Sequence, residues 1–186
     1  MAISIKLNTK GLEALKNKLI NPQAIDTAVR IAATTALAEI KTRVFERGEA
    51  SDDADIGVYS RKPLYVSLSE SPRKFVPRGK NSDSPKLKNG KQRKSGYFKG
   101  GYDEFKTVVG RNIGKVNLSL SGQLNNQMTI IATSKGYGIG WNNTEMAKRA
   151  KYFPKKYKKE IWLPTKTELE LIKAVAAKNY ASALPE

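Results

Sequence analysis

Residues 116–133 read VNLSLSGQLNNQMTIIAT and residues 136–141 read GYGIGW. Apolar side chains occupy every second position in three runs, at 116 to 120, 128 to 132 and 137 to 141. This period of two is typical of strands with one buried face. Ser121-Gly122 ends the first run, and Ser134-Lys135-Gly136 predicts a tight turn between the other two. The stretch therefore predicts three antiparallel strands whose apolar face the rest of the chain must cover.

The longest helix is predicted to precede this sheet, over residues 22 to 47. Asn21 is a favourable N-cap, Pro22 suits the first helical position, and Gly48 suits the residue after the last. A mostly alanine stripe follows one helix face: Ile25, Ala28, Val29, Ala32, Ala36, Ile40 and Val44. Because small side chains allow close approach, we expect this helix to lie across the sheet.

Shorter elements complete the predicted fold. Alternation within residues 2–7 predicts an edge strand, and a brief helix follows with Leu12, Leu15 and Leu19. After the sheet, Asn143 caps one helix, and the capping box of Thr165 and Glu168 opens a C-terminal amphipathic helix. The sequence thus predicts an α+β fold in a single domain over residues 1–186. Its small antiparallel sheet of about four strands is packed by the long N-terminal helix and the C-terminal helix.

Residues 49–114 differ in character from the segments on either side. They begin with acidic residues and then become strongly basic, among many prolines, glycines and serines, with no sustained hydrophobic period. Such compositions seldom bury enough apolar area to offset the entropy lost on ordering. We therefore predict a long polar, basic insertion loop, partly mobile in the free protein, whose aromatic residues order it on a partner.

The composition limits the possible functions. Lys and Arg number 34 against 17 Asp and Glu, a net charge of +17, which predicts attraction to nucleic acid or to an acidic protein surface. The absence of cysteine and histidine excludes disulfides and thiolate metal sites, and removes the commonest general base. No apolar run approaches the ~20 residues of a membrane span, and the first residues do not resemble a signal peptide. We expect a soluble protein without membrane contacts.

Three motifs fail the spacing that known binding sites need. Residues 136–140 (GYGIG) do not match the dinucleotide fingerprint, residues 110–115 are one residue short of a phosphate-binding loop, and the acids at 52–55 miss the calcium-loop pattern. We therefore predict no cofactor, no metal and no catalytic residue. A carboxylate-based metal nuclease ranks third among the function classes, because no acid pair is suitably spaced on a predicted strand.

Two clusters mix basic with aromatic residues and are the candidate contacts with a protein partner or DNA. The first contains Lys91, Arg93, Lys94, Tyr97, Phe98, Lys99, Tyr102 and Phe105. The second contains Lys148, Arg149, Lys151, Lys155, Lys156, Lys158 and Lys159. Charge steers an encounter and aromatic rings anchor it. Simple solvation, protein docking and DNA contact all remain open for these clusters at this point.

Short motifs carry a resemblance to a known family. The sequence LSGQL at 120–124 and the pair Ile139-Gly140 match a Ser/Thr-Gly-x-Leu step and an Ile-Gly strand, and Leu163-Pro164 precedes the last helix. With this order of elements, the chain resembles the tail-completion or virion-morphogenesis proteins of tailed bacteriophages over most of residues 10–48 and 116–180. Many relatives carry Tyr-Ala-x-x-His and Arg-Pro-Phe-Leu-Gly-Leu, where this chain reads MAKRA and EIWLP.

The resemblance implies a non-enzymatic α+β structural subunit. It would form a ring in the phage neck or at the head-proximal end of the tail, as a head-to-tail connector, after synthesis in the bacterial host cytoplasm. Its partners would be copies of itself, other neck and tail proteins, and DNA met without sequence preference in the channel. The alternative is a basic nucleic-acid-binding protein that contacts phosphates through its Lys/Arg clusters. The ring hypothesis ranks first because the order of elements supports it independently of charge.

Overall fold

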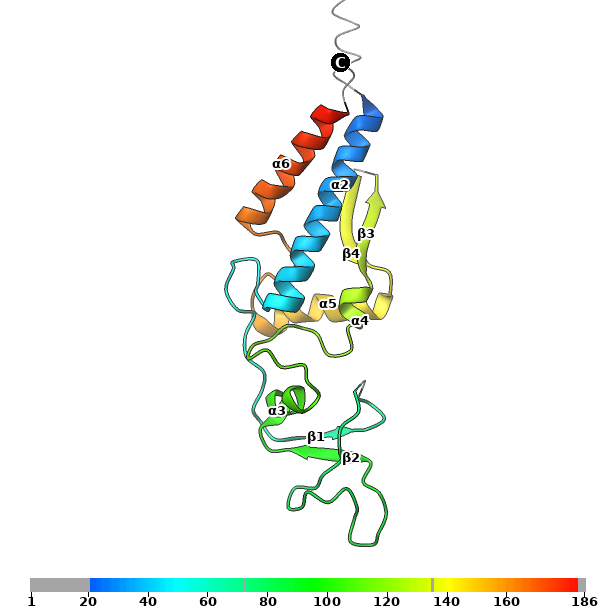
Figure 1. Ribbon diagram of the computed structural model, residues 1–186, viewed down its shortest axis with the longest axis vertical. Coiled ribbons are helices and arrows are strands. Elements are labelled where there is room, and N and C mark those ends of the chain that lie inside the picture. The colour runs from blue at the N-terminus through cyan, green and yellow to red at the C-terminus, as the bar shows by residue number, and fades with distance from the viewer. Residues whose placement is uncertain (1–20, 72, 135, 184–186) are drawn as a thin grey trace, which may run out of the picture.

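The computed structural model describes residues 21–183 except 72 and 135, so the predicted strand at 2–7 and the brief helix after it lie outside the described residues. Within them the fold is α+β, with five α-helices, one π-helical segment and two separate two-stranded antiparallel sheets (Figure 1). The elements are α2 (Pro22–Lys41), η1 (Thr42–Arg47), β1 (Leu64–Ser67), β2 (Ser95–Phe98), α3 (Gly101–Val108), α4 (Gln123–Asn126), β3 (Met128–Thr133), β4 (Gly136–Trp141), α5 (Thr144–Tyr157) and α6 (Lys166–Ser182).

The molecule is elongated, and its elements divide along the long axis. Helices α2 and α6 and the hairpin β3–β4 form one end, and α4 and α5 lie across the middle (Figure 1). Strands β1 and β2 and helix α3 form the opposite end. We call residues 60–111 the lobe, and the remaining described residues the body.

Helix α2 forms where the sequence predicts it. The Asn21 side chain accepts hydrogen bonds from the backbone N–H groups of Gln23 and Ala24 at 3.0 and 3.2 Å, which caps the helix. The helix continues through η1 to Gly48, whose φ of +69° favours glycine and whose Cα faces the Val116 carbonyl. A Cβ at Gly48 would lie 2.6 Å from that carbonyl oxygen. The buried stripe consists of Ala24, Ala28, Ala32, Ala36 and Ile40.

The hairpin β3–β4 also confirms the prediction made from alternation. Met128 pairs with Trp141, Ile130 with Ile139 and Ala132 with Tyr137, which puts these six side chains on one face. Helix α2 packs against this hairpin, and the Tyr137 hydroxyl on that face donates to the Asp26 carboxylate of α2 at 3.0 Å.

The third predicted strand of this sheet does not form. Residues 116–120 are irregular, and the short helix α4 follows them. The Val116 N–H donates to the Gly57 carbonyl at 2.9 Å, and the Asn117 N–H donates to the Tyr59 hydroxyl at 3.2 Å. Because these backbone groups bond to the chain entering the lobe, they do not enter a strand ladder. The prediction of one sheet of about four strands is therefore wrong for the described residues.

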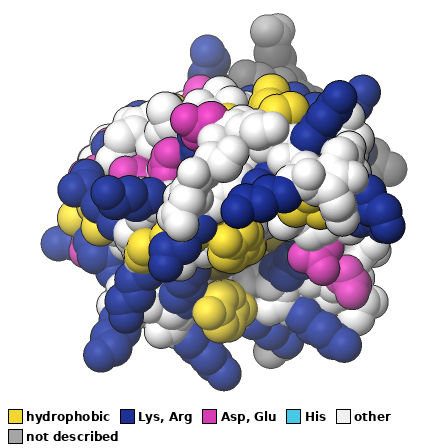
Figure 2. Space-filling model, turned by 90° about the horizontal axis from the view of Figure 1, so that it is seen from below, with side chains coloured by type: hydrophobic (Ala, Val, Ile, Leu, Met, Phe, Trp, Pro, Cys, Tyr) yellow, Lys and Arg dark blue, Asp and Glu magenta, His cyan; other side chains and the backbone are white. Residues whose placement is uncertain are grey.

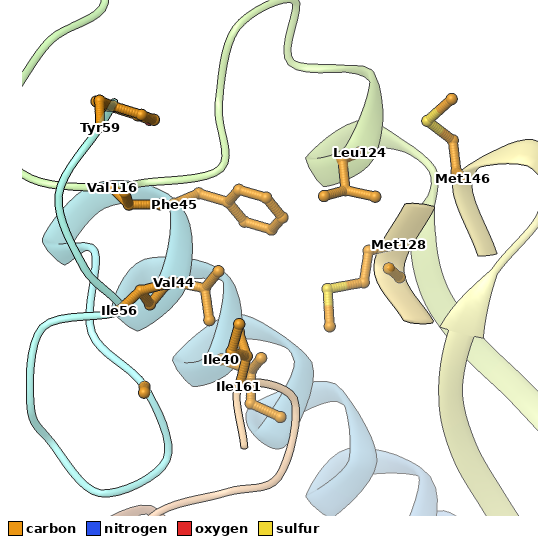
Figure 3. Packing of buried hydrophobic residues seen from close by; sticks show 12 residues of the cluster. Ile40, Val44, Phe45, Ile56, Tyr59, Val116, Leu124, Met128, Met146 and Ile161 are labelled. Carbon is orange, nitrogen blue, oxygen red and sulfur yellow. The ribbon is translucent and has the colours of Figure 1, made fainter. Parts of the chain in front are cut away.

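The hydrophobic core lies where α2 and η1 meet the middle of the molecule. Ile40, Val44 and Phe45 project from the helix toward side chains of distant segments (Figure 3). Those partners are Ile56, Val116, Leu124, Met128, Met146 and Ile161, all at most 8% exposed. Burial of side chains of this size contributes about 1.5 to 3 kcal/mol each. Ile56 belongs to this core, so the core also holds in place the chain that leads into the lobe.

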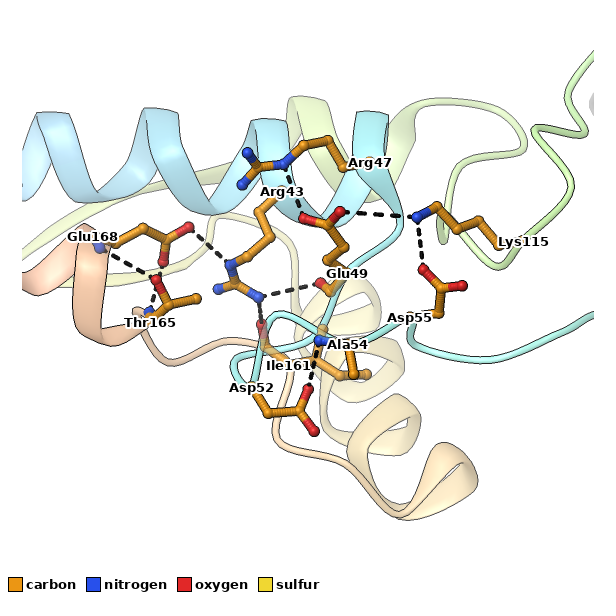
Figure 4. Close-up of polar contacts among 10 residues, drawn as sticks. All are labelled: Arg43, Arg47, Glu49, Asp52, Ala54, Asp55, Lys115, Ile161, Thr165 and Glu168. Carbon is orange, nitrogen blue, oxygen red and sulfur yellow. Dashed lines mark hydrogen bonds and ion pairs between the residues drawn. The ribbon is translucent and has the colours of Figure 1, made fainter.

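A buried arginine joins four segments beside this core. Arg43 is fully buried, and its Nε lies 2.8 Å from Glu168 Oε1. Its guanidinium also donates to the carbonyls of Glu49 and Ile161, both at 3.2 Å (Figure 4). A further bond from Nη2 reaches the carbonyl of Leu163 at 2.8 Å. Glu168 simultaneously completes the predicted capping box, because its Oε2 accepts from the Thr165 N–H at 2.8 Å. The charge is thus paired and all of its donor nitrogens are used.

The insertion predicted as a loop is a folded lobe. Strand β1 pairs with β2 from Leu64 opposite Phe98 to Ser67 opposite Ser95, and α3 packs against β2. The rings of Phe75, Phe98 and Phe105 contact one another edge to face, with centroids 5.2 to 5.7 Å apart. These three phenylalanines supply a small core of their own, which composition alone did not reveal.

Because Arg43 and Glu168 are buried as an ion pair, we expect removal of one partner to lower the stability of the fold strongly. We expect Glu168→Ala to lower the free energy of unfolding by about 3 to 5 kcal/mol, because it leaves a guanidinium charge buried without its counter-ion. Urea unfolding of the purified protein measures this. Arg47→Ala is the matched control: Arg47 also pairs with a glutamate, Glu49, at 3.0 Å, but its side chain is 49% exposed. Its loss should cost at most about 1 kcal/mol. Equal losses in the two variants would contradict the assignment.

Candidate interface at the basic end of the molecule

Charge is distributed very unevenly along the molecule. The lobe contains fourteen Lys and Arg against four Asp and Glu, and residues 142–160, which include α5, contain seven against two. The remainder of the body, in residues 21–59, 112–141 and 161–183, contains nine against nine. Figure 2 views the molecule from the lobe end and shows Lys and Arg side chains projecting around its outline. The positive charge is therefore concentrated in the lobe and in α5 beside it.

The tip of the lobe, residues 79–94, is held in shape by backbone hydrogen bonds. The Gly79 N–H donates to the Ser82 carbonyl and the Leu87 N–H to the Lys91 carbonyl, both at 2.7 Å. The Arg93 guanidinium donates through Nε to the Ser84 carbonyl at 2.9 Å. Such cross-loop bonds satisfy backbone groups that a loop without secondary structure leaves to water.

Like Arg93, Arg78 has a structural role in the lobe. Arg78 donates through Nε to the Tyr97 carbonyl at 3.0 Å and forms an ion pair with Glu104 of α3. Its guanidinium also lies over the Phe98 ring, 5.0 Å from the centroid. Arg78 and Arg93 thus fasten the loops of the lobe and are not free for a partner.

The lysines of the tip behave differently. Their side chains are exposed, and none makes a hydrogen bond or ion pair with any residue that the structure describes. They are Lys80, Lys86, Lys88, Lys91 and Lys94. The predicted contacts Lys91 and Lys94 belong to this set, and Lys99 beyond the tip is exposed and unpaired in the same way. Only Asp83 opposes them within the tip.

The aromatic residues of the first predicted cluster are split by the alternation of β2. Phe98 and Phe105 are 1% exposed and form the lobe core, so their prediction as contact residues is wrong. Tyr97 instead lies on the outer face, where its ring is 4.9 Å from that of Tyr65 across the ribbon. Tyr65 is 59% exposed. The pair Tyr65 and Tyr97 is the aromatic surface that the lobe offers to solvent.

The second predicted cluster lies on α5 and on the turn that ends it. Lys148, Lys151, Lys155 and Lys158 are exposed without a side-chain partner among residues 21–183, leaving aside 72 and 135. Arg149 is also exposed, with Glu145 at 3.8 Å, and Lys156 lies over the Tyr157 ring at 5.2 Å. Lys159 differs, because its Nζ donates to the Asp55 carbonyl at 2.9 Å and lies 3.6 Å from the Asp52 carboxylate.

A buried polar cluster joins the lobe to the body. Lys106 of α3 is 1% exposed, and its ammonium donates to Asn117 Oδ1 at 3.1 Å and to the Ser119 carbonyl, and lies over the Tyr59 ring. The Tyr59 hydroxyl donates to the same Asn117 oxygen at 2.9 Å. Sequence reasoning missed this cluster, because nothing in the spacing of these residues predicts that they meet.

Burial shifts the pKa values of this cluster. Loss of water lowers the pKa of Lys106 to about 8, and repulsion from Arg111 adds to the shift. Burial raises the pKa of the Tyr59 hydroxyl well above its usual range. The Tyr59 phenol therefore stays neutral at physiological pH, whereas the Lys106 ammonium titrates close to physiological pH.

A cleft of about 480 Å³ opens between the lobe and α5 beside this cluster. It brings together residues from both predicted clusters, since Tyr102, Arg149 and Lys156 line it together with Lys106. Phe153 and Tyr157 add aromatic surface, and Glu70 adds one acid. The cleft has the cations and rings to hold an anionic or aromatic group. It offers no group of three or more acidic residues that could hold a metal ion within the described part of the chain.

Comparison with known proteins gives no relative for this chain. No family model matches the sequence, and neither a curated protein nor a solved structure is similar to it. Among the helices of the described residues, none is long and apolar enough to cross a membrane.

The pKa of Lys106 predicts a rise in stability between pH 8 and 10. The unfolded chain holds this proton up to its usual pKa of 10.5, whereas the folded protein releases it from about pH 8. Deprotonation therefore favours the folded state, and we expect the free energy of unfolding to increase by about 2 kcal/mol over this window. Urea unfolding at a series of pH values measures it. Lys106→Met should remove the rise, and a rise that persists in that variant would assign it to another group.

Proposed function

We propose that this protein is a structural subunit of a tailed-phage virion that forms a ring in the neck or the head-proximal tail. There it completes the tail or joins head to tail as part of the connector. The role requires neither a cofactor nor catalysis. The observation that carries the proposal is the division of the elongated molecule into a nearly neutral end, formed by α2, α6 and the hairpin, and a strongly basic end.

The neutral end supports assembly into a ring. Copies in a cyclic assembly must place equivalent surfaces side by side, and a charge of +17 spread evenly over each copy would oppose this. Helices α2 and α6 and the hairpin carry only a small excess of positive charge. Neighbouring copies can therefore pack through these elements while their basic ends are directed toward another partner.

The basic end supports contact with the polyanion that a neck must hold. The lobe and α5 would face neighbouring neck or tail proteins, or DNA in the channel, where only sequence-independent phosphate contacts are useful. Such a protein is made in the bacterial host cytoplasm and functions in the virion. The order of the long helix, hairpin and C-terminal helix also fits the resemblance carried by LSGQL at 120–124.

A second candidate function is a free basic nucleic-acid-binding protein. The unpaired lysines of the tip and the exposed Tyr65–Tyr97 pair favour it, because cations and exposed rings together suit phosphates and bases. It ranks second because it leaves the neutral end without a role.

Deleting the gene in the phage that encodes the protein tests the proposed function. We expect electron micrographs of the lysate to show separate heads and tails, or unfinished tails, and the infectious titre to fall by several orders of magnitude. A plasmid copy of the gene supplies the control, and it should restore complete particles. Complete, infectious virions that lack the protein would reject the ring and favour the second candidate.

A further inference from the structure

We propose that the tip of the lobe holds the sugar–phosphate backbone of duplex DNA, without sequence preference, through Lys80, Lys86, Lys88, Lys91 and Lys94. This inference deepens the proposed function by naming the partner of the basic end and the residues that meet it. It rests on the proposed function only for where the DNA lies in the particle. The contact itself is a property of the single chain.

Arginine and lysine have different roles in the lobe. Arg78 and Arg93 make directional bonds to carbonyls and a carboxylate inside the lobe, as suits a planar guanidinium. The five tip lysines are left without a partner among the described residues. An ammonium acts as a compact point charge that needs no fixed geometry, which suits phosphates met in any register.

The composition of the tip surface indicates the kind of partner. Lysine is depleted in the buried parts of protein–protein interfaces, whereas contact with the DNA backbone is mostly electrostatic. Leu87, at 41% exposed, is the large apolar residue that the tip exposes. A surface with five lysines, one acid and so little apolar area matches a polyanion better than a folded protein.

The lack of aromatic residues in the tip favours a duplex over a single strand. Proteins that bind single strands combine a basic groove with aromatic rings on which bases stack. Residues 79–94 contain no aromatic residue. Tyr65 and Tyr97 lie outside this segment, and their rings lie against each other. The tip lysines can therefore reach phosphates but have no ring beside them in this segment for an unstacked base.

The loops of the tip are also held in place before any DNA arrives. The bonds from Leu87 to Lys91 and from Arg93 to Pro85 cross the loop at 2.7 and 2.8 Å. The buried polar cluster of Lys106, Asn117 and Tyr59 holds the lobe against the body. Binding would then order the lysine side chains but little of the backbone, which limits its entropic cost.

Salt dependence of DNA binding tests the inference on the purified full-length protein. The probe is a fluorescent duplex of about 30 base pairs and mixed sequence, followed by anisotropy from low to moderate salt. Each neutralised phosphate contributes about −0.9 to the slope of log K against log salt, so five lysines predict a slope near −4.5. The triple variant K86Q/K88Q/K91Q should lower the magnitude of that slope by about 2.7.

A matched variant on α6, at the nearly neutral end, separates a site from bulk charge. K166Q/K173Q/K178Q removes the same charge from exposed lysines that have no side-chain partner among the described residues, and should leave the slope unchanged. Equal decreases in the two triple variants would overturn the inference, because net charge alone would then explain binding. An unchanged slope in the tip variant would overturn it as well.

A single strand of the same length is the remaining comparison. We expect it to bind no more tightly than the duplex. Tighter binding of the single strand that is lost in Y65A/Y97A would overturn the inference and assign nucleic-acid binding to the tyrosine pair. The gene deletion is scored independently of all these results. If complete particles require the protein but its tip does not bind DNA, this inference alone is rejected. If the tip binds DNA but complete particles form without the protein, the proposed function alone is rejected.

Discussion

The Arg43 guanidinium is the interaction on which the arrangement of the body depends. A charge at zero exposure is tolerated only when it is paired and its donors are used, and the four partners of Arg43 come from three places in the chain. Glu168 fixes the start of α6, and the carbonyls of Ile161 and Leu163 fix the turn before it. The carbonyl of Glu49 fixes the chain that leads toward the lobe. One side chain thereby sets the position of α6, and of the chain at Glu49 that leads toward the lobe, relative to α2.

Elements with local causes could be predicted from the sequence. The Asn21 cap, the Gly48 stop and the capping box of Thr165 and Glu168 involve residues within a few positions of each other, so their patterns are visible in the chain. The hairpin β3–β4 belongs to the same class, because its register depends on alternation and on one tight turn. Interactions between residues that are close together in the chain leave patterns that can be recognised in the sequence.

Elements with distant causes could not be predicted. Residues 116–120 alternate like a strand, but the N–H groups of Val116 and Asn117 bond to residues 57 and 59, which lie far away in the sequence. Phe75, Phe98 and Phe105 form the lobe core from three places with no common period. Composition indicated a partly mobile insertion loop because most of its residues are polar, yet three phenylalanine rings and the ion pair of Arg78 with Glu104 help to organise it. The candidate site was predicted in part for the same reason: its lysines were identified as exposed charge, but Phe98 and Phe105 were mistaken for contacts.

The unequal distribution of charge gives this molecule a strong electric dipole along its length. A long anion approaching from any direction would turn the molecule before touching it, so the lobe arrives first. If copies form a ring with their lobes toward the axis, the same charges repel across the opening and strain the ring. Added salt relieves that strain but also weakens the hold on phosphates, so closure and retention of DNA respond to ionic strength in opposite directions. The enclosed nucleic acid would then act as the counter-ion of the ring, and the filled assembly would be more stable than the empty one.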